Sequence, residues 1–282
     1  SSGSFLFYKK MKLLSLTKLL LHRLLPAGII SAILFVAIFM ACSKEHAPDV
    51  KIYAIKYGES LFPEKYMYRN SSTGKETQFT WLCYYVEYLN RRILIDTGFV
   101  NPSYIKMFNI RNYTRPSDIL RNNGIDPESI TDIIITHGHF DHADGISDYG
   151  SARIVISATA LGAINKGNYG NSISKKFMGN TGIISFQDTY NFEKHLTIKE
   201  IGGHAEGSSV VYLEYGEHRY CFTGDEVYSA KSIIDKIPNG TVTNINNNIK
   251  FISEYNPDFI PLTFHNPDFY GRAEKFIRIY PD

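Results

Sequence analysis

Six consecutive residues, His137-Gly138-His139-Phe140-Asp141-His142, constrain this chain of 282 residues more than any other segment. Three imidazoles and one carboxylate within six positions are a dense group of side chains of the types that bind divalent cations. The apolar run Ile133-Ile134-Ile135-Thr136 comes directly before them and predicts a buried strand. The group is therefore expected on a loop at a strand end, where catalytic side chains of α/β proteins tend to lie.

The spacing within this group favours two metal ions over one. On an extended backbone, His137, His139 and Asp141 would lie on one side, and His142 would point elsewhere. The alternative is a polar loop that is rich in histidine by chance, and the density of the group argues against it.

Three later segments also end an apolar run on a histidine or an acidic residue. They are Ile201-Gly202-Gly203-His204, Cys221-Phe222-Thr223-Gly224-Asp225 and Pro261-Leu262-Thr263-Phe264-His265. A single histidine after a strand is more often a surface residue than a ligand, but together with the first group these segments predict a two-metal site. The seven candidate ligands are His137, His139, Asp141, His142, His204, Asp225 and His265.

The charge of the chain is unevenly distributed. Five of the 30 basic residues lie in residues 1–41, which contain no acidic residue. The rest of the chain therefore carries 25 basic against 28 acidic side chains, a net charge of −3. A nucleic-acid partner would require a basic surplus on the folded part, so none is expected.

Residues 1–41 are expected to be a secretory signal peptide. Residues 1–10 precede Met11 and are expected to be an upstream extension or an expression remnant. Basic residues and an apolar stretch follow, and Ala41-Cys42 resembles a bacterial lipobox with Phe39 where leucine is usual. We expect lipidation of Cys42, a tether over 42–49, and an exported lipoprotein anchored in the membrane of the cell envelope. An uncleaved signal anchor is the alternative.

Residues 50–282 are expected to form one layered α/β domain. Alternating apolar residues predict strands, including a hairpin of Phe79–Leu89 with Arg92–Ile95. Residues 166–188 are expected to form a cover, and Asp268–Ile279 a closing helix. Cys83 and Cys221 lie in strand-like runs and are expected to be core residues rather than a disulfide.

The ordered motifs resemble those of the metallo-β-lactamase superfamily. The likeness covers His137-x-His139-x-Asp141-His142, then Gly203-His204, Thr223-Gly224-Asp225 and Phe264-His265, and it includes the early segment Ile95-Asp96-Thr97-Gly98. It implies a four-layer αβ/βα sandwich. By resemblance, the first ion would bind to His137, His139 and His204, the second to Asp141, His142 and His265, and Asp225 would bridge them. Asp96 would support a ligand, with a turn carboxylate as the alternative.

Within that superfamily, the sequence looks most like the N-acyl-homoserine lactonases, which act in quorum quenching. In that branch a tyrosine follows the bridging aspartate at the offset of Tyr228 and donates a hydrogen bond to the developing oxyanion. Chance placement of one of 20 tyrosines is the alternative. Gly138, Asp144 and Ala205-Glu206 depart from the lactonase pattern.

The resemblance implies a metal-dependent hydrolase whose catalytic residues are Asp141 and Tyr228. Its cofactors would be two divalent cations, with Zn²⁺ expected and Mn or Fe as alternatives. Its substrate would be a small acyl lactone or ester. A glyoxalase II-like thioesterase or another ester hydrolase is the main alternative, and a β-lactamase or a non-catalytic metal-binding protein is less favoured. The sequence leaves the oligomeric state open.

Overall fold

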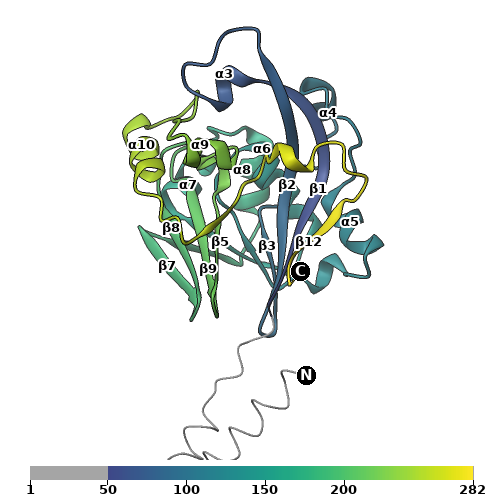
Figure 1. Ribbon diagram of the computed structural model, residues 1–282. Coiled ribbons are helices and arrows are strands. Elements are labelled where there is room, and N and C mark those ends of the chain that lie inside the picture. The colour runs from purple at the N-terminus through teal and green to yellow at the C-terminus, as the bar shows by residue number, and fades with distance from the viewer. Residues whose placement is uncertain (1–49, 282) are drawn as a thin grey trace, which may run out of the picture. The chain divides into compact units, whose positions relative to one another are not determined.

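The computed structural model describes residues 50–281, so the predicted signal peptide, Cys42 and the tether before Val50 lie outside the described residues. Within them, two β-sheets pack face to face with helices on their outer sides (Figure 1). The strand order is β12-β1-β2-β3-β4-β5-β6 in one sheet and β11-β10-β9-β8-β7 in the other. This helix–sheet–sheet–helix order confirms the predicted αβ/βα sandwich.

The first sheet is antiparallel from β12 to β3 and parallel from β3 to β6. The predicted hairpin is present as β2 and β3. The strands are β1 (Val50–Pro63), β2 (Glu76–Tyr88), β3 (Arg91–Ile95), β4 (Asp132–Ile134), β5 (Arg153–Ser157), β6 (Ile183–Phe186) and β12 (Phe276–Tyr280).

The second sheet is antiparallel except for its last pair, in which β10 and β11 run parallel. Its strands are β7 (Thr189–Glu193), β8 (Leu196–Glu200), β9 (Ser209–Tyr215), β10 (His218–Phe222) and β11 (Ile260–Leu262).

Short helices cover the outer sides of both sheets and connect the strands. They are α3 (Glu64–Met67), α4 (Ser103–Met107), α5 (Pro116–Asn122), α6 (Phe140–Ala143), α7 (Ala158–Asn165), α8 (Asn171–Met178), α9 (Ala230–Ile234) and α10 (Ile245–Ser253). Single 3₁₀ turns are η1 (Pro127–Ser129), η2 (Asp144–Asp148), η3 (Gly224–Glu226) and η4 (Pro267–Phe269).

The period-two pattern of the strands places side chains in separate cores. Along β1, Ile52 and Ala54 face the core between the sheets, while Ile55 and Tyr57 face the core on the helical side. A third core lies between the outer face of the second sheet and α10, and it includes Cys221 and Phe251. Cys83 and Cys221 are buried and free, as expected.

The predicted closing helix is wrong. Residues 267–269 form η4, and the chain then passes Gly271, which has a φ of +74°, before β12 pairs with the edge of β1. Pairing satisfies the backbone groups of that edge, which an isolated helix would leave open. The predicted cover is also more regular than expected, because it contains α8 and β6.

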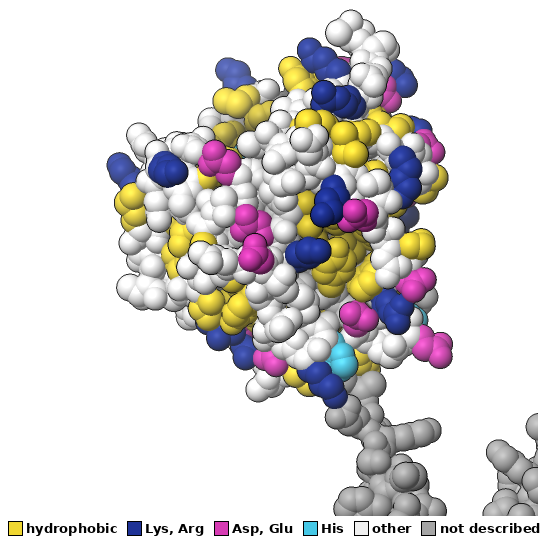
Figure 2. All heavy atoms as spheres, turned by 90° about the vertical axis from the view of Figure 1, so that its left-hand side faces the viewer, with side chains coloured by type: hydrophobic (Ala, Val, Ile, Leu, Met, Phe, Trp, Pro, Cys, Tyr) yellow, Lys and Arg dark blue, Asp and Glu magenta, His cyan; other side chains and the backbone are white. Residues whose placement is uncertain are grey.

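Charged side chains of both signs lie on the surface of the described residues. Figure 2 shows the face near α10, where basic and acidic side chains are mixed with apolar and uncharged ones. Residues 50–281 contain no helix with the length and apolarity that crossing a membrane requires.

Candidate active site

The seven candidate ligands meet at one edge of the sandwich, near α6 in Figure 1. Each follows the end of a strand, as the sequence predicted. His137 and His139 follow β4, and His204, Asp225 and His265 follow β8, β10 and β11. One detail of the prediction is wrong: Asp141 does not continue an extended segment but lies in the first turn of α6.

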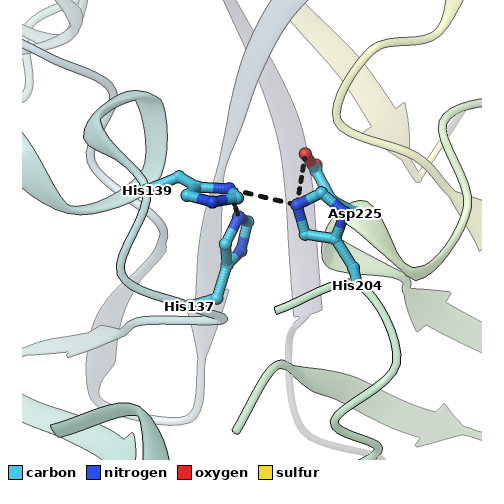
Figure 3. Close-up of side chains that lie close together, drawn as sticks. All are labelled: His137, His139, His204 and Asp225. Carbon is cyan, nitrogen blue, oxygen red and sulfur yellow. Dashed lines mark hydrogen bonds and ion pairs between the residues drawn. The ribbon is translucent and has the colours of Figure 1, made fainter. Parts of the chain in front are cut away.

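A first set contains the ligand atoms of His137, His139, His204 and Asp225, all within 4.8 Å of one another (Figure 3). The Nδ1 atom of His139 lies 2.9 Å from Nε2 of His137 and 3.0 Å from Nε2 of His204. Nε2 of His204 is 3.5 Å from Oδ2 of Asp225. Three imidazole nitrogens and one carboxylate oxygen therefore converge on one point.

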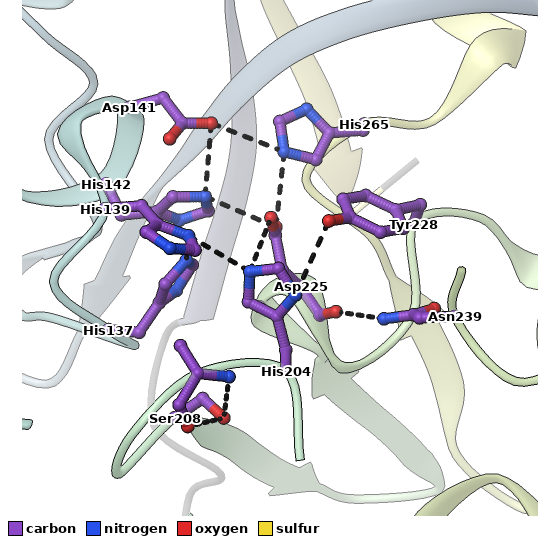
Figure 4. Close-up of polar contacts among 12 residues, drawn as sticks. His137, His139, Asp141, His142, His204, Ser208, Asp225, Tyr228, Asn239 and His265 are labelled. Carbon is purple, nitrogen blue, oxygen red and sulfur yellow. Dashed lines mark hydrogen bonds and ion pairs between the residues drawn. The ribbon is translucent and has the colours of Figure 1, made fainter. Parts of the chain in front are cut away.

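A second set contains Asp141, His142, Asp225 and His265 (Figure 4). The Oδ1 atom of Asp225 lies 3.2 Å from Nε2 of His142 and 3.2 Å from Nε2 of His265. Oδ2 of Asp141 is 3.4 Å and 3.5 Å from the same two nitrogens. Asp225 thus belongs to both sets, with one carboxylate oxygen facing each.

Three buried atoms at this point indicate that the site is built for cations. Nε2 of His142, Nε2 of His265 and Oδ1 of Asp225 are buried, and none has a hydrogen bond of good geometry to another described residue. Buried polar atoms nearly always have a partner. A cation between them would satisfy all three, and the nitrogen and oxygen donors are those that Zn²⁺ and related divalent ions accept.

The electrostatics differ between the two sets. Burial lowers the pKa of His137 well below its ordinary value and lowers that of His204 to about 3, so both rings are neutral, which is the ligating form. In the second set, burial opposes charge, but the neighbouring imidazoles hold the pKa of Asp225 well below its usual range. Burial likewise opposes the charge of His142, but the surrounding carboxylates raise its pKa well above the usual value.

Residues behind the ligands hold the rings in place. Asp96 is buried after β3, and its Oδ2 lies 2.7 Å from Nδ1 of His142, while Thr136 donates to both carboxylate oxygens of Asp96. Nδ1 of His265 lies 2.9 Å from the carbonyl oxygen of Thr80. In both rings this leaves Nε2 directed at Asp225. Asp96 therefore contacts a ligand, and the sets above do not include it.

A cavity of about 320 Å³ opens onto the ligands. Its wall is largely aromatic and includes Phe62, Phe79, Trp81 and Phe140. Tyr228 also lines it, and the phenol oxygen lies 3.4 Å from Nδ1 of His204. Burial raises the pKa of Tyr228 well above its ordinary value, so the hydroxyl keeps its proton at physiological pH.

Two residues near the ligands were missed by sequence reasoning. Tyr169, from the predicted cover, packs edge-on against His139 with ring centroids 5.2 Å apart. Glu226 is completely buried and accepts hydrogen bonds from the backbone of the His204 loop. In the sequence, only its position directly after Asp225 pointed to a role for Glu226. Its hydrogen-bond partners lie about 20 residues away along the chain, so local sequence could not reveal them.

Comparisons with known proteins agree with this geometry. The family model of the metallo-beta-lactamase superfamily matches residues 81–278. An N-acyl homoserine lactonase of Bacillus thuringiensis is 22% identical over 249 residues, covering 82% of this chain and 98% of the relative.

Solved structures of lactonases share the fold. A quorum-quenching N-acyl homoserine lactone lactonase superposes with a TM-score of 0.68 at 19% identity, covering 80% of this chain and 98% of that one. AidC, a dizinc quorum-quenching lactonase in complex with a product, gives 0.62 at 15% identity, with coverages of 84% and 96%. Because the family model spans more than half of the sequence and the two-set site lies at the expected strand ends, this chain belongs to the metallo-beta-lactamase superfamily of hydrolases.

Proposed function

We propose that this protein is a dinuclear metal-dependent hydrolase that opens the lactone ring of N-acyl-homoserine lactones, and so acts in quorum quenching. The observation that carries the proposal is the position of Tyr228, a buried and protonated phenol in the same aromatic cavity as the ligand cluster. The lactonases among its relatives support the same substrate class.

The cavity favours a neutral, apolar substrate. Among the described residues, none of those lining it is a lysine or an arginine. The carboxylate of a β-lactam, or the carboxylates of a glutathione thioester, would therefore find no cationic side chain there. With about 320 Å³, the cavity is at the small end of ligand sites, which span roughly 300–1,000 Å³. We therefore expect a preference for short acyl chains.

The chemistry follows from the two sets of ligands. Two divalent cations bound there would lower the pKa of a water molecule to near neutrality and polarise the carbonyl oxygen of the substrate. Tyr228 can donate a hydrogen bond to the oxyanion that develops on that oxygen. Asp141 lines the cavity, so its carboxylate can accept the proton of the attacking water and return it to the ring oxygen as the carbon–oxygen bond breaks. The product is an open-chain hydroxy acid.

A thioesterase of the glyoxalase II type is the second candidate. It would use the same ligands, but the absence of cationic residues around the cavity argues against a glutathione conjugate. Zn²⁺ is the proposed metal, because imidazole and carboxylate donors suit it; Mn and Fe suit the same donors.

The test uses the full chain purified with Zn²⁺ and N-hexanoyl-homoserine lactone. Ring opening releases one proton per turnover, which a pH indicator in weak buffer measures. Asp225→Asn is the negative control, because it removes a charge shared by both sets. Turnover of a glutathione thioester without lactone opening would indicate that the protein is a thioesterase of the glyoxalase II type. Turnover of neither by the metal-loaded protein would indicate another hydrolase.

We also propose, from the sequence, that the protein is an exported lipoprotein held in the cell envelope through Cys42. Mass spectrometry of the mature N-terminus tests this. A diacylglyceryl group on an N-terminal Cys42 is the expected result, and an unmodified chain that begins at Met11 would contradict it.

A further inference from the structure

His204 is carried by a glycine-rich loop between β8 and β9. His137 and His139 lie between β4 and α6, whereas His204 sits in an irregular loop that contains three glycines. Two of them, Gly202 and Gly207, have φ values of +66° and +68°. Glycine loses more conformational freedom on ordering than other residues. Backbone hydrogen bonds bridge the loop, among them those from the amides of Ile201 and Gly202 to the carbonyl oxygen of Ser208, and side-chain contacts add to them in holding His204 toward Asp225.

Glu226 supplies those contacts. Its side chain is 0% exposed, and its Oε1 atom accepts hydrogen bonds from the amides of Gly203, at 3.0 Å, and His204, at 3.1 Å. The hydroxyl of Ser208, at the other end of the loop, donates to the same oxygen. One carboxylate oxygen thus joins Gly203 and His204 to Ser208 across the loop.

The other side of Glu226 is fixed by α10 and its neighbouring loop. Nδ2 of Asn248 donates to the carbonyl oxygen of Glu226 at 2.7 Å and lies 3.3 Å from its Oε2. Oδ1 of Asn248 accepts from the amide of Asn239, and Nδ2 of Asn239 donates to the carbonyl oxygen of Asp225 at 2.7 Å (Figure 4). The network therefore joins the His204 loop to the backbone of Asp225.

The fit is too close for a side chain at Gly203. A Cβ atom there would lie 2.4 Å from Oε2 of Glu226 and 2.8 Å from the backbone nitrogen of Asn248. The loop, the carboxylate and α10 are thus packed as one unit.

We propose that Glu226 is a positioning residue that holds the His204 loop against Asp225, so that the metal position of His137, His139 and His204 is formed before the ion binds. Glu226 has no hydrogen bond to a ligand atom and does not line the cavity, and it acts through the backbone of His204. The inference rests on the proposed metal binding and is independent of the identity of the substrate.

Glu226→Gln is the sharpest test because it preserves the shape of the side chain. The amide oxygen of glutamine can still accept from Gly203 and His204, but its NH₂ group would then face Nδ2 of Asn248, which is also a donor. Asn248 cannot rotate its amide without losing the hydrogen bond from Asn239. The variant therefore disturbs the network without creating a void.

The experiment titrates the metal-free full chain with Zn²⁺ by calorimetry and follows the ¹⁵N signals of the histidine rings by NMR. Glu206→Gln is the matched control, because Glu206 lies in the same loop but is exposed and contacts Asn168. Ser208→Ala is a second, milder variant that removes one donor from Glu226.

In Glu226→Gln, we expect one of the two Zn²⁺ ions to bind roughly ten- to hundredfold more weakly than in the wild type. This is the range typical for residues that support metal ligands. The His204 signals should identify the weakened position, Ser208→Ala should show a smaller loss, and Glu206→Gln should behave as wild type. Wild-type affinity at both positions in Glu226→Gln would overturn the proposal, as would equal weakening of both with a lower Tm. A wild-type chain that binds no metal would instead overturn the proposed function.

Discussion

The Nδ1 atom of His142 lies 2.7 Å from Oδ2 of Asp96, a carboxylate that is completely buried at the end of the neighbouring strand. Asp96 has a φ of +61°, a conformation that aspartate and asparagine tolerate better than most residues. With Thr136 donating to both carboxylate oxygens, Asp96 can accept the Nδ1 proton of His142 and leave Nε2 free to bind a cation.

Asp96→Asn is expected to weaken metal binding at the second position roughly ten- to hundredfold, because the amide NH₂ would face Nδ1 of His142 and favour the wrong tautomer. Calorimetric titration with Zn²⁺ measures the effect. Asp188→Asn is the matched control, since Asp188 also has a positive φ, of 56°, but is exposed. Equal affinities in the two variants would contradict the role of Asp96.

Gly138→Ala is expected to destabilise the protein by about 1–3 kcal/mol, the usual cost of overpacking. A Cβ atom at Gly138 would lie 2.3 Å from the ring of Tyr169. The additional change Tyr169→Ala should relieve that contact, so the double variant should lose less stability than the two single changes predict together. Thermal unfolding measures the three variants.

Gly162→Ala is the control for that series. A Cβ atom at Gly162, in α7, meets nothing within 4 Å, so the variant should be stabilised by about 0.5–1 kcal/mol through helix propensity. For Gly138→Ala combined with Tyr169→Ala, a loss of stability equal to the sum of the two single losses would indicate that Tyr169 does not occupy the space beside Gly138.

Tyr228→Phe is expected to lower kcat for lactone opening by roughly 100- to 1,000-fold with little change in KM, because one oxyanion donor is lost. Tyr66→Phe is the control, since Tyr66 lines the same cavity but is 41% exposed. Steady-state kinetics on the metal-loaded enzyme measures both. An unchanged kcat in Tyr228→Phe would remove this residue from the proposed mechanism.

Metal affinity is expected to fall as the pH is lowered. Surrounding carboxylates raise the pKa of His142 well above its ordinary value against the effect of burial, so the metal-free ring keeps a proton at neutral pH. That proton must leave before Nε2 binds a cation, so binding releases it and the affinity increases with pH until the pKa of His142 is passed. Calorimetry in buffers with different ionisation enthalpies counts the protons. Zn²⁺ binding without proton release at pH 7 would contradict this account.

The candidate ligands were predictable because each follows a recognisable strand. His137 to His142, His204, Asp225 and His265 end apolar runs, and strand ends of α/β proteins gather at one edge. The hairpin of β2 and β3 and the core positions of Cys83 and Cys221 were likewise readable from local patterns. Their signals lie within a few neighbouring residues.

The closing segment could not be predicted in this way. Residues 276–280 become β12 because the edge of β1, more than 200 positions earlier, offers unpaired backbone groups. The same holds for Tyr169, which fills the space that Gly138 leaves open, and for the short helix that carries Asp141.

By itself, the sequence determined the chemical identity and order of the candidate ligands, because four of them lie within six positions and the other three each follow an apolar strand. Only the tertiary structure decided that Asp225 faces both sets, which nitrogen of each imidazole points inward, and that Glu226 closes the His204 loop. These relationships depend on distances of about 3 Å between atoms that are far apart in the chain. Tertiary packing determines these distances, and the local sequence pattern does not encode them.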